Sequence, residues 1–410
     1  MNFEFFVVKR LIGGKSHKSS ISAPIIKIAI AAIAIGVVMM LVSFATGLGL
    51  QEKIRDKIAA FNGHINISNY DNNSSQVTLT PVDKNQEFYP EFNTVDGIAH
   101  VQAVATKFGI IRTETDFEGV IVKGVGTDYN WSYFKDFLVE GKLPNVDDKL
   151  NDEVLISSYL ANRLQLNFGD KVPTYFLREG SERPLTRGFV ITGIYDSGFM
   201  EFDKLYVLAD IRHIQRLNRW EENQVGNFEV FLNDFNEIDK KGQEVYENTG
   251  SFLDTQTITQ TYYSIFEWLA LFDFNIALII GIMILVAGIN MITALLVLIL
   301  ERTQMIGILK ALGGNDWSIR KIFLYNAGYL IIKGLFWGNL IGLGLLLLQK
   351  YFKLVPLDPS TYYVTEVPVY LNWDYILAVN LGTLVLCMLM LIIPSIIISK
   401  ISPSRAIKFE

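Results

Sequence analysis

Residues 28–50, IAIAAIAIGVVMMLVSFATGLGL, contain no charged side chain and are long enough to cross a bilayer as one helix. A hydrocarbon core of about 30 Å requires about 20 apolar residues, because each adds about 1.5 Å of helix. Three further segments meet this requirement, one of them with Lys333 near its middle. The sequence therefore predicts four transmembrane helices, at residues 28–50, 272–300, 322–348 and 375–398.

The composition of the 410-residue chain fits a membrane protein with a large water-exposed part. Half of its residues are hydrophobic and only 19% are charged, against roughly 25% charged in soluble domains. This excludes a disordered chain, a fibrous rod and a small disulfide scaffold. The single cysteine, Cys387, excludes an intrachain disulfide. No basic domain stands out, so we expect no nucleic-acid partner.

The segments between the predicted helices indicate their orientation. Residues 1–27, 301–321 and 399–410 are rich in Lys and Arg, which favours the cytoplasmic side. Residues 51–271 carry a net charge of −13 and the rest of the chain +7. We therefore expect both termini in the cytoplasm, with residues 51–271 and the short loop 349–374 outside.

The segment 51–271 has the pattern of an α+β domain. Short runs with alternating apolar residues indicate strands, and apolar residues at helical spacing indicate helices. The predicted strands include HINIS (64–68), GVIVKGV (119–125), and a hairpin of KVPTYFL (171–177) and GFVITGIY (188–195). The predicted helices include residues 51–62, which continue the first membrane helix, and residues near 157–166, 210–219 and 236–248.

No pattern in the sequence indicates catalysis. GGKS at residues 13–16 resembles the end of a phosphate-binding loop, but that motif needs a glycine where this chain has Lys9. The four histidines are scattered and share no metal-ligand spacing. We therefore predict no catalytic residue, no metal site and no cofactor in this chain.

Two features of the membrane part suggest contacts. The segment ERTQMIGILKALGGNDWSIRKIFL (301–324) forms a helical hairpin that either lies on the lipid headgroups or contacts a cytoplasmic protein. Lys333 should face a protein interior, water or an anionic headgroup, since a charge in the bilayer costs about 2.5–3.5 kcal/mol. A packing or assembly role for Lys333 is as consistent with the sequence as a transport role. Gly338 and Gly342 form a GxxxG step that permits close helix contact.

Three stretches carry a resemblance to a known family. They are ERTQMIGILKALGGNDWSIRKIF (301–323), LVEGKLPN with DEVLISSYLANRLQLNFGDKV (138–172), and MNFEFFVVKRL (1–11). With the order of one span, a large external domain and three spans, the chain resembles type VII ABC-transporter permeases of the MacB/FtsX superfamily. It most resembles the LolC/LolE transmembrane subunits of lipoprotein-releasing systems. The N-terminal stretch and the overall length favour this branch.

The resemblance implies a non-catalytic subunit in the bacterial inner membrane. Residues 51–271 would form a MacB-type periplasmic core domain, and a separate cytoplasmic ABC ATPase would bind ATP and Mg. The other expected partners are a second permease copy or a paralogue, a lipoprotein substrate and a periplasmic lipoprotein carrier. Residues 301–321 would contain the coupling helix that contacts the ATPase, through Glu301, Arg302, Ile306, Gly307, Leu309, Lys310 and Gly313.

The resemblance also suggests where lipid and carrier bind. The first two spans would line a lipid-entry cavity, with Met39, Met40, Phe44, Phe272 and Phe274 near the acyl chains. The connector 178–188 occupies the place of a carrier-binding hook, with Arg178, Glu179, Arg183 and Arg187 as candidate contacts, although it is shorter and more charged than such a hook.

Three other functions fit the sequence less well. An FtsX-like permease that activates a periplasmic cell-wall hydrolase usually has a smaller external domain. A MacB-like efflux subunit typically carries a fused ATPase domain. A membrane scaffold or sensor without an energy source would need no coupling helix.

Overall fold

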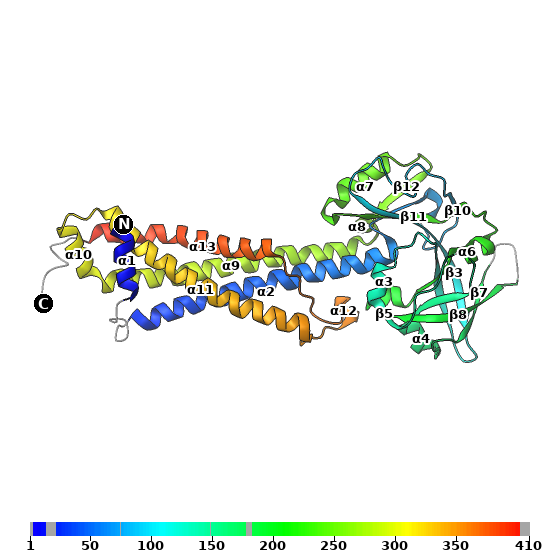
Figure 1. The fold of residues 1–410 in the computed structure, drawn as a ribbon, viewed down its shortest axis with the longest axis horizontal. Helices are drawn as coiled ribbons and strands as arrows, with labels where there is room; N and C mark the ends of the chain where they lie inside the picture. The colour runs from blue at the N-terminus through cyan, green and yellow to red at the C-terminus, as the bar shows by residue number, and fades with distance from the viewer. Residues whose placement is uncertain (1–2, 14–21, 74, 148, 178–182, 402–410) are drawn as a thin grey trace. The chain divides into compact units, whose positions relative to one another are not determined.

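The computed structural model describes residues 3–13, 22–73, 75–147, 149–177 and 183–401. The chain divides into two compact units (Figure 1). The membrane unit comprises residues 1–51, 269–356 and 366–410. The sheet unit comprises residues 52–268 and 357–365.

Four helices in the described part of the chain are long and apolar enough to cross a membrane. The prediction of four such segments is therefore confirmed. The helices are α2 (Ser22–Asn62), α9 (Tyr263–Glu301), α11 (Asp316–Phe352) and α13 (Trp373–Ser395). Shorter helices of the membrane unit are α1 (Phe3–Gly13), which crosses α11 (Figure 1), α10 (Thr303–Ala311) and α14 (Ile397–Lys400).

Glycines on α11 bring its backbone close to α2. A Cβ atom at Gly338 would lie 2.7 Å from the Val37 Cβ and 2.9 Å from the Ala34 carbonyl oxygen. A Cβ atom at Gly342 would lie 3.2 Å from the Leu41 Cδ1. Small residues at this spacing allow van der Waals contact between helices in lipid, where no hydrophobic effect drives them together. The predicted GxxxG contact is confirmed, and its partner is α2.

A pair of amides connects α11 to α13 within the apolar part of the membrane unit. The Asn339 Nδ2 donates to the Asn380 Oδ1 at 2.6 Å, and the Asn380 Nδ2 donates back at 2.9 Å. Each amide thus provides a hydrogen-bond donor and an acceptor for the other, so that no water is needed. Hydrogen bonds of this kind contribute about 0.6 kcal/mol on average between membrane helices.

One large mixed sheet forms the core of the sheet unit. Its strands lie in the order β12-β1-β11-β3-β4-β9-β6-β8-β5, and β7 pairs with β3 and β8. The strands are β1 (Ile65–Asn69), β3 (Ile98–Arg112), β4 (Phe117–Val125), β5 (Leu138–Gly141), β6 (Glu153–Ser157), β7 (Lys171–Phe176), β8 (Leu185–Tyr195), β9 (Tyr206–Asp210), β11 (Asn227–Leu232) and β12 (Leu253–Thr257). A separate pair is formed by β2 (Val82–Asp83) and β10 (Gln224–Val225).

Short helices complete the sheet unit. They are α3 (Ser132–Phe137), α4 (Ser158–Leu164), α5 (Met200–Asp203), α6 (Ile211–Asn218), α7 (Ile238–Glu247), α8 (Ile258–Thr261) and α12 (Pro359–Tyr362), with 3-10 turns at Tyr70–Asn72 and Phe235–Glu237.

The sheet joins segments that enter and leave the membrane unit. β1 follows α2 and lies between β11 and β12, and β12 leads through α8 into α9. Between α2 and β1, Gly63 has φ +66°, and a Cβ atom there would lie 2.9 Å from the Glu229 Cβ. Only glycine allows both this turn and the close approach to β11.

Several sequence predictions for this unit are confirmed. HINIS forms β1, and the predicted hairpin is the antiparallel pair of β7 and β8. The predicted helix near residues 210–219 is α6. The helix predicted near 157–166 is α4, which ends at Leu164 because Gln165 adopts a left-handed conformation with φ +56°.

His64 makes the stability of the sheet unit depend on pH. Its Nδ1 accepts a hydrogen bond of 2.9 Å from the Leu232 backbone N–H, which requires a neutral ring. Burial and the nearby charge of Arg55 lower the pKa of His64 to about 4. Because this pKa lies below the unfolded value of about 6.5, the stabilisation is complete above that pH and is lost as the pH falls toward 4.

We predict that the free energy of unfolding falls more steeply on acidification in the unaltered chain than in His64→Gln. The difference reaches about 3 kcal/mol between pH 7 and pH 4, because glutamine keeps an acceptor and gains no proton. Burial raises the pKa of Asp203 to about 6, but this opposite effect is common to both proteins. Urea unfolding of the detergent-solubilised chain measures the difference, and equal pH slopes would contradict the role of His64.

Candidate functional site

The hairpin between α9 and α11 is the first candidate for a functional site. Arg302 separates α9 from α10, and Gly313 with φ +89° allows the turn after α10. The Asn315 side chain accepts a hydrogen bond of 3.2 Å from the Trp317 N–H and so caps the start of α11. The turn after α10 and the start of α11 are therefore each set by a specific residue, Gly313 and Asn315.

Several residues predicted to contact an ATPase lie inside the membrane unit. Ile306 and Gly307 are buried, and Leu309 packs against the core of the unit. This side of α10 faces the rest of the membrane unit. Glu301 and Gly313 are exposed and Arg302 is half-exposed.

Lys310 contacts the C-terminal part of the same chain. Its Nζ donates to the Ser399 carbonyl at 3.2 Å and to the Ile401 carbonyl at 2.9 Å, and lies 2.9 Å from the Asp316 Oδ1. Arg320 adds a hydrogen bond to the Ser399 hydroxyl. Lys310 thus fixes the end of α14 against the hairpin, so its replacement would disturb the fold as well as any partner contact.

The exposed side of the hairpin is apolar. Ile308, Leu312 and Trp317 are 46%, 80% and 51% exposed, and we call these three residues the hairpin face. Both sides of α10 are apolar in sequence, so periodicity alone did not identify which side is buried. Ile308 was missed for that reason, whereas Trp317 lies on α11, after the last predicted contact, Gly313.

The residues predicted to lie near acyl chains are spread over α2 and α9. Met40 is buried in the core of the membrane unit, whereas Met39 and Phe274 are exposed. Phe44 stacks on Tyr375 with ring centroids 5.5 Å apart, and Phe272 is half-buried. The structure does not gather these side chains into one site.

The candidate carrier contacts lie at the β7–β8 connection. Arg178 and Glu179 lie outside the described residues. Arg183 is exposed, and Arg187 is half-buried on β8 opposite Thr174. A contact surface at this connection stays a prediction.

Lys333 lies on an exposed, apolar side of α11. Its Nζ lies 4.5 Å from the centre of the Tyr329 ring. Asp273, an acidic residue of α9, instead accepts a hydrogen bond of 2.9 Å from Gln51. Asp273 is thus bonded to α2.

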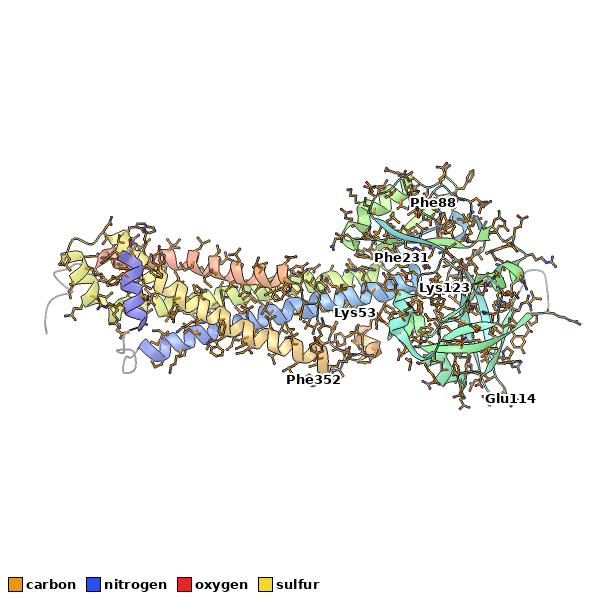
Figure 2. The ribbon with its side chains drawn as sticks, viewed as in Figure 1. Lys53, Phe88, Glu114, Lys123, Phe231 and Phe352 are labelled. Carbon is orange, nitrogen blue, oxygen red and sulfur yellow. The ribbon has the colours of Figure 1, made fainter. Side chains whose placement is uncertain are left out.

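A buried polar network ties the end of α2 to the sheet. The Lys123 Nζ lies 2.7 Å from the Glu229 Oε1 and donates to the Phe61 carbonyl at 2.7 Å. The Gln102 amide donates to the Glu229 Oε2 at 2.8 Å, and the Tyr129 hydroxyl donates to the Ala60 carbonyl at 3.2 Å. Figure 2 shows Lys123 inside the sheet unit. The network satisfies two carbonyls at the C-terminal end of α2, where the helix itself supplies no donor.

Each side chain of this buried pair stabilises the charged form of the other. Burial lowers the pKa of Lys123 and raises the pKa of Glu229, while the attraction between them opposes both shifts. Removal of one partner would leave the other buried without a counter-charge, which typically costs about 3–5 kcal/mol. Sequence analysis missed this pair, because a Lys and a Glu far apart in sequence usually lie on the surface.

We predict that Lys123→Met lowers the free energy of unfolding of the sheet unit by about 3–5 kcal/mol. Lys123→Met combined with Glu229→Met should recover most of this loss, because no unpaired charge remains. Lys240→Met is the matched control, since Lys240 lies 3.7 Å from Glu244 at the surface and should change stability by less than about 1 kcal/mol. Urea unfolding measures all three, and equal losses in the single and double variants would contradict the account.

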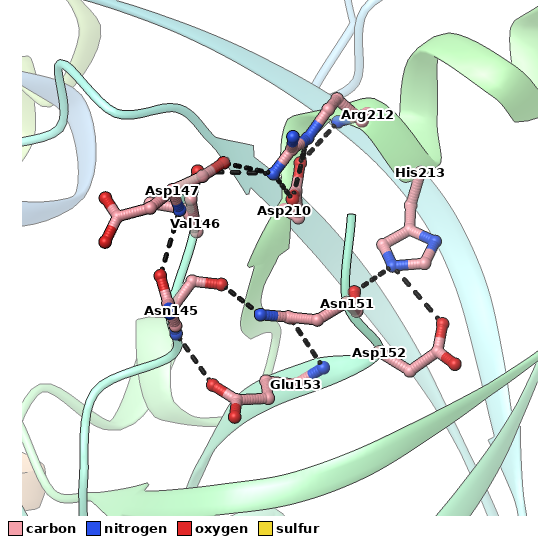
Figure 3. A network of polar contacts seen from close by, with 9 residues as sticks. All are labelled: Asn145, Val146, Asp147, Asn151, Asp152, Glu153, Asp210, Arg212 and His213. Carbon is pink, nitrogen blue, oxygen red and sulfur yellow. Dashed lines mark hydrogen bonds and ion pairs between the residues drawn. The ribbon is translucent and has the colours of Figure 1, made fainter. Parts of the chain in front are cut away.

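A second network contacts residues 145–147 and 151–153, which lie between or beside β5 and β6 (Figure 3). Arg212 donates to the Val146 and Asp147 carbonyls at 3.3 and 2.9 Å while its guanidinium also bonds Asp210. His213 contacts the Asn151 carbonyl at 2.7 Å. These bonds hold in place part of the stretch that carries the resemblance noted for residues 138–172.

Among the described residues, no cluster of His, Cys, Asp or Glu could hold a metal ion. The polar networks described above bond to the protein's own backbone. Their arrangement supports structure and does not resemble an acid–base or nucleophilic site.

Comparison with known families decides the classification. Residues 28–244 match the family model of the MacB-like periplasmic core domain, and residues 277–403 match that of the FtsX-like permease C-terminal domain. The first match alone spans more than half of the chain. The chain belongs to the FtsX-like permeases with a MacB-like periplasmic core domain.

Curated relatives match this permease over nearly its whole length. A lipoprotein-releasing system transmembrane protein LolC from Haemophilus influenzae is 23% identical over 390 residues, 92% of each chain. LolC from Neisseria meningitidis serogroup B is 20% identical and covers 100% of both chains. LolE from Haemophilus influenzae is 20% identical over 99% of both chains. The C-terminal family match includes the hairpin face, and the N-terminal match includes Lys123 and Glu229.

Proposed function

We propose that this permease is a transmembrane subunit of an ABC transporter that extracts lipoproteins from the inner membrane and releases them to a periplasmic carrier. The observation that carries the proposal is the full-length match to relatives named as lipoprotein-releasing transmembrane proteins. The relatives include LolC and LolE, which supports a complex of this chain with a second copy or with a paralogue.

The orientation in the proposal follows from charge. The basic segments 1–27, 301–321 and 399–410 favour the cytoplasm, and the strongly acidic segment 51–271 favours the periplasm. The hairpin face would then meet a partner in the cytoplasm, while the sheet unit would meet the released lipoprotein.

The chemistry of the substrate requires a source of energy. Removal of an acyl anchor from a bilayer costs about 0.8 kcal/mol per methylene, so several long chains together cost far more than thermal energy supplies. The sequence of this chain contains no complete phosphate-binding loop. In this proposal a separate ATPase binds and hydrolyses ATP with Mg, and this chain transmits the resulting motion.

Depletion of this chain in its native bacterium tests the proposed function. We predict that mature, acylated lipoproteins accumulate in the inner membrane, measured by membrane fractionation and immunoblotting. Depletion should leave integral outer-membrane barrels correctly placed at early times, because they carry no acyl anchor. If lipoproteins reach the outer membrane normally while cell-wall hydrolysis fails, the chain acts instead as an activator of a hydrolase.

The hairpin face supplies the contact with the ATPase in this proposal. We predict that Leu312→Glu lowers the amount of ATPase that copurifies with the permease by at least about tenfold, because it places a charge in an apolar contact. Lipoprotein release should fall in parallel. Phe252→Glu is the matched control, since Phe252 is an equally exposed apolar residue of the sheet unit, at 85%.

Unchanged copurification of ATPase with the Leu312→Glu variant would show that another surface makes this contact. Membrane insertion is checked separately by protease protection, because a variant that fails to insert would also lose the ATPase.

A further inference from the structure

A polar cleft lies on one face of the sheet unit. It has a volume of about 460 Å³ and is lined by the end of α2, the strands β1, β11 and β12, residues 72–73 and 75–78, and residues 201–206. Twelve of its 21 described lining residues carry amide or hydroxyl side chains other than tyrosine. The Lys123–Glu229 and Arg212–Asp210 networks do not account for this concentration of amide and hydroxyl side chains.

The strand register places these side chains in rows. Asn66 of β1 lies opposite Gln256 of β12 on one side and Glu229 of β11 on the other. Ser68 lies opposite Asn227 of β11. Neighbouring strands are about 4.8 Å apart, so the rows extend about 10 Å across three strands. The alternate residues of β1, Ile65 and Ile67, are fully buried on the opposite face.

Two of the amides, those of Asn66 and Asn227, are bonded to each other. Their bond leaves one hydrogen-bond donor and one acceptor facing the cleft. The Asn227 Nδ2 donates to the Asn66 Oδ1 at 2.6 Å. Among the described residues, this leaves the Asn66 amide N–H groups and the Asn227 oxygen for a ligand. Exchanging the oxygen and nitrogen of both amides would again leave one donor and one acceptor. A donor beside an acceptor is the complement of a peptide group.

The charges in the cleft favour a neutral ligand. Glu201 and Glu229 are the acidic side chains among its described lining, and Lys123 neutralises Glu229. No Lys or Arg side chain is found among the described residues that line it. An anionic ligand would therefore lose its hydration without gaining a counter-charge.

The aromatic residues at one end of the cleft are occupied with one another. Phe61 and Phe202 pack with ring centroids 4.7 Å apart, and Tyr206 lies 5.4 Å from Phe61. Tyr262 lies edge-on to Phe202 and bonds Asn62 through its hydroxyl. Because each of these rings already packs against another ring of the group, the cleft suits a peptide better than a stacked sugar ring.

We propose that this cleft binds an extended, uncharged polypeptide segment of the lipoprotein during its transfer. The inference rests on the proposed function, which makes a polypeptide with an acyl anchor the substrate. The amide pair of Asn66 and Asn227 bonds one peptide group, and Gln256 and Ser68 lie beside it in the same rows.

Site-specific crosslinking in the complete complex tests the proposal. A photoreactive amino acid replaces Gln256, with one at the exposed Thr186 of β8 as the matched control. The probes are two purified lipoproteins of known sequence that differ only in the segment after the acylated residue, one rich in Ser and Asn and one rich in Glu. We expect position 256 to capture the first lipoprotein at least about fivefold more than the second, and position 186 to capture neither preferentially.

A second variant measures the contribution of the amide pair. Asn66→Leu combined with Asn227→Leu should raise the lipoprotein concentration for half-maximal release about tenfold, while protease resistance shows whether the sheet unit is folded. If the unaltered complex releases lipoprotein but position 256 captures none, or captures a neighbouring subunit, the cleft proposal is wrong and the proposed function stands. If the unaltered complex releases no lipoprotein, the proposed function itself fails, and this proposal fails with it.

Discussion

The bond between Lys123 and Glu229 joins a membrane helix to a sheet. Lys123 donates at once to the Glu229 carboxylate and to the Phe61 carbonyl at the end of α2. The ion pair lies where β4 and β11 face the last turn of that helix, and Gly63 allows β11 to approach. Because all of these groups are buried, none can exchange its partner for water without a large cost. The end of the first long helix is therefore held as firmly as the interior of the sheet.

The membrane unit meets the same requirement, that polar groups away from water bond to other protein groups. Backbone groups in lipid must bond within their own helix, and polar side chains there bond one another, as Asn339 and Asn380 do. Lys310 lies near the end of α10 and holds Ser399 and Ile401 against the hairpin, whereas Lys333 lies within α11. The end of α2, the pair of α11 and α13, and the hairpin after α9 are thus each held by specific bonds. The hairpin face is an exposed apolar surface.

The sequence predicted the features that depend on composition and local spacing. The four apolar helices, the β7–β8 hairpin and the contact at Gly338 all follow from patterns within about 30 residues. The side of α10 that faces outward could not be predicted, because Ile306 and Ile308 are equally apolar. The pairing of Lys123 with Glu229 could not be predicted either, since 106 residues separate them. The amide cleft likewise requires β1, β11 and β12 to be neighbours, which only the sheet order establishes.

The central claim is that hydrolysis in a partner ATPase drives lipoprotein release through this permease. The most direct measurement reconstitutes the purified permease, its ATPase and an acylated lipoprotein of known sequence in proteoliposomes, and follows the lipoprotein that passes to a soluble carrier. The account predicts release with ATP and Mg, and none with a non-hydrolysable analogue or without nucleotide. Equal release without ATP, or no release from a complex that hydrolyses ATP, would contradict it.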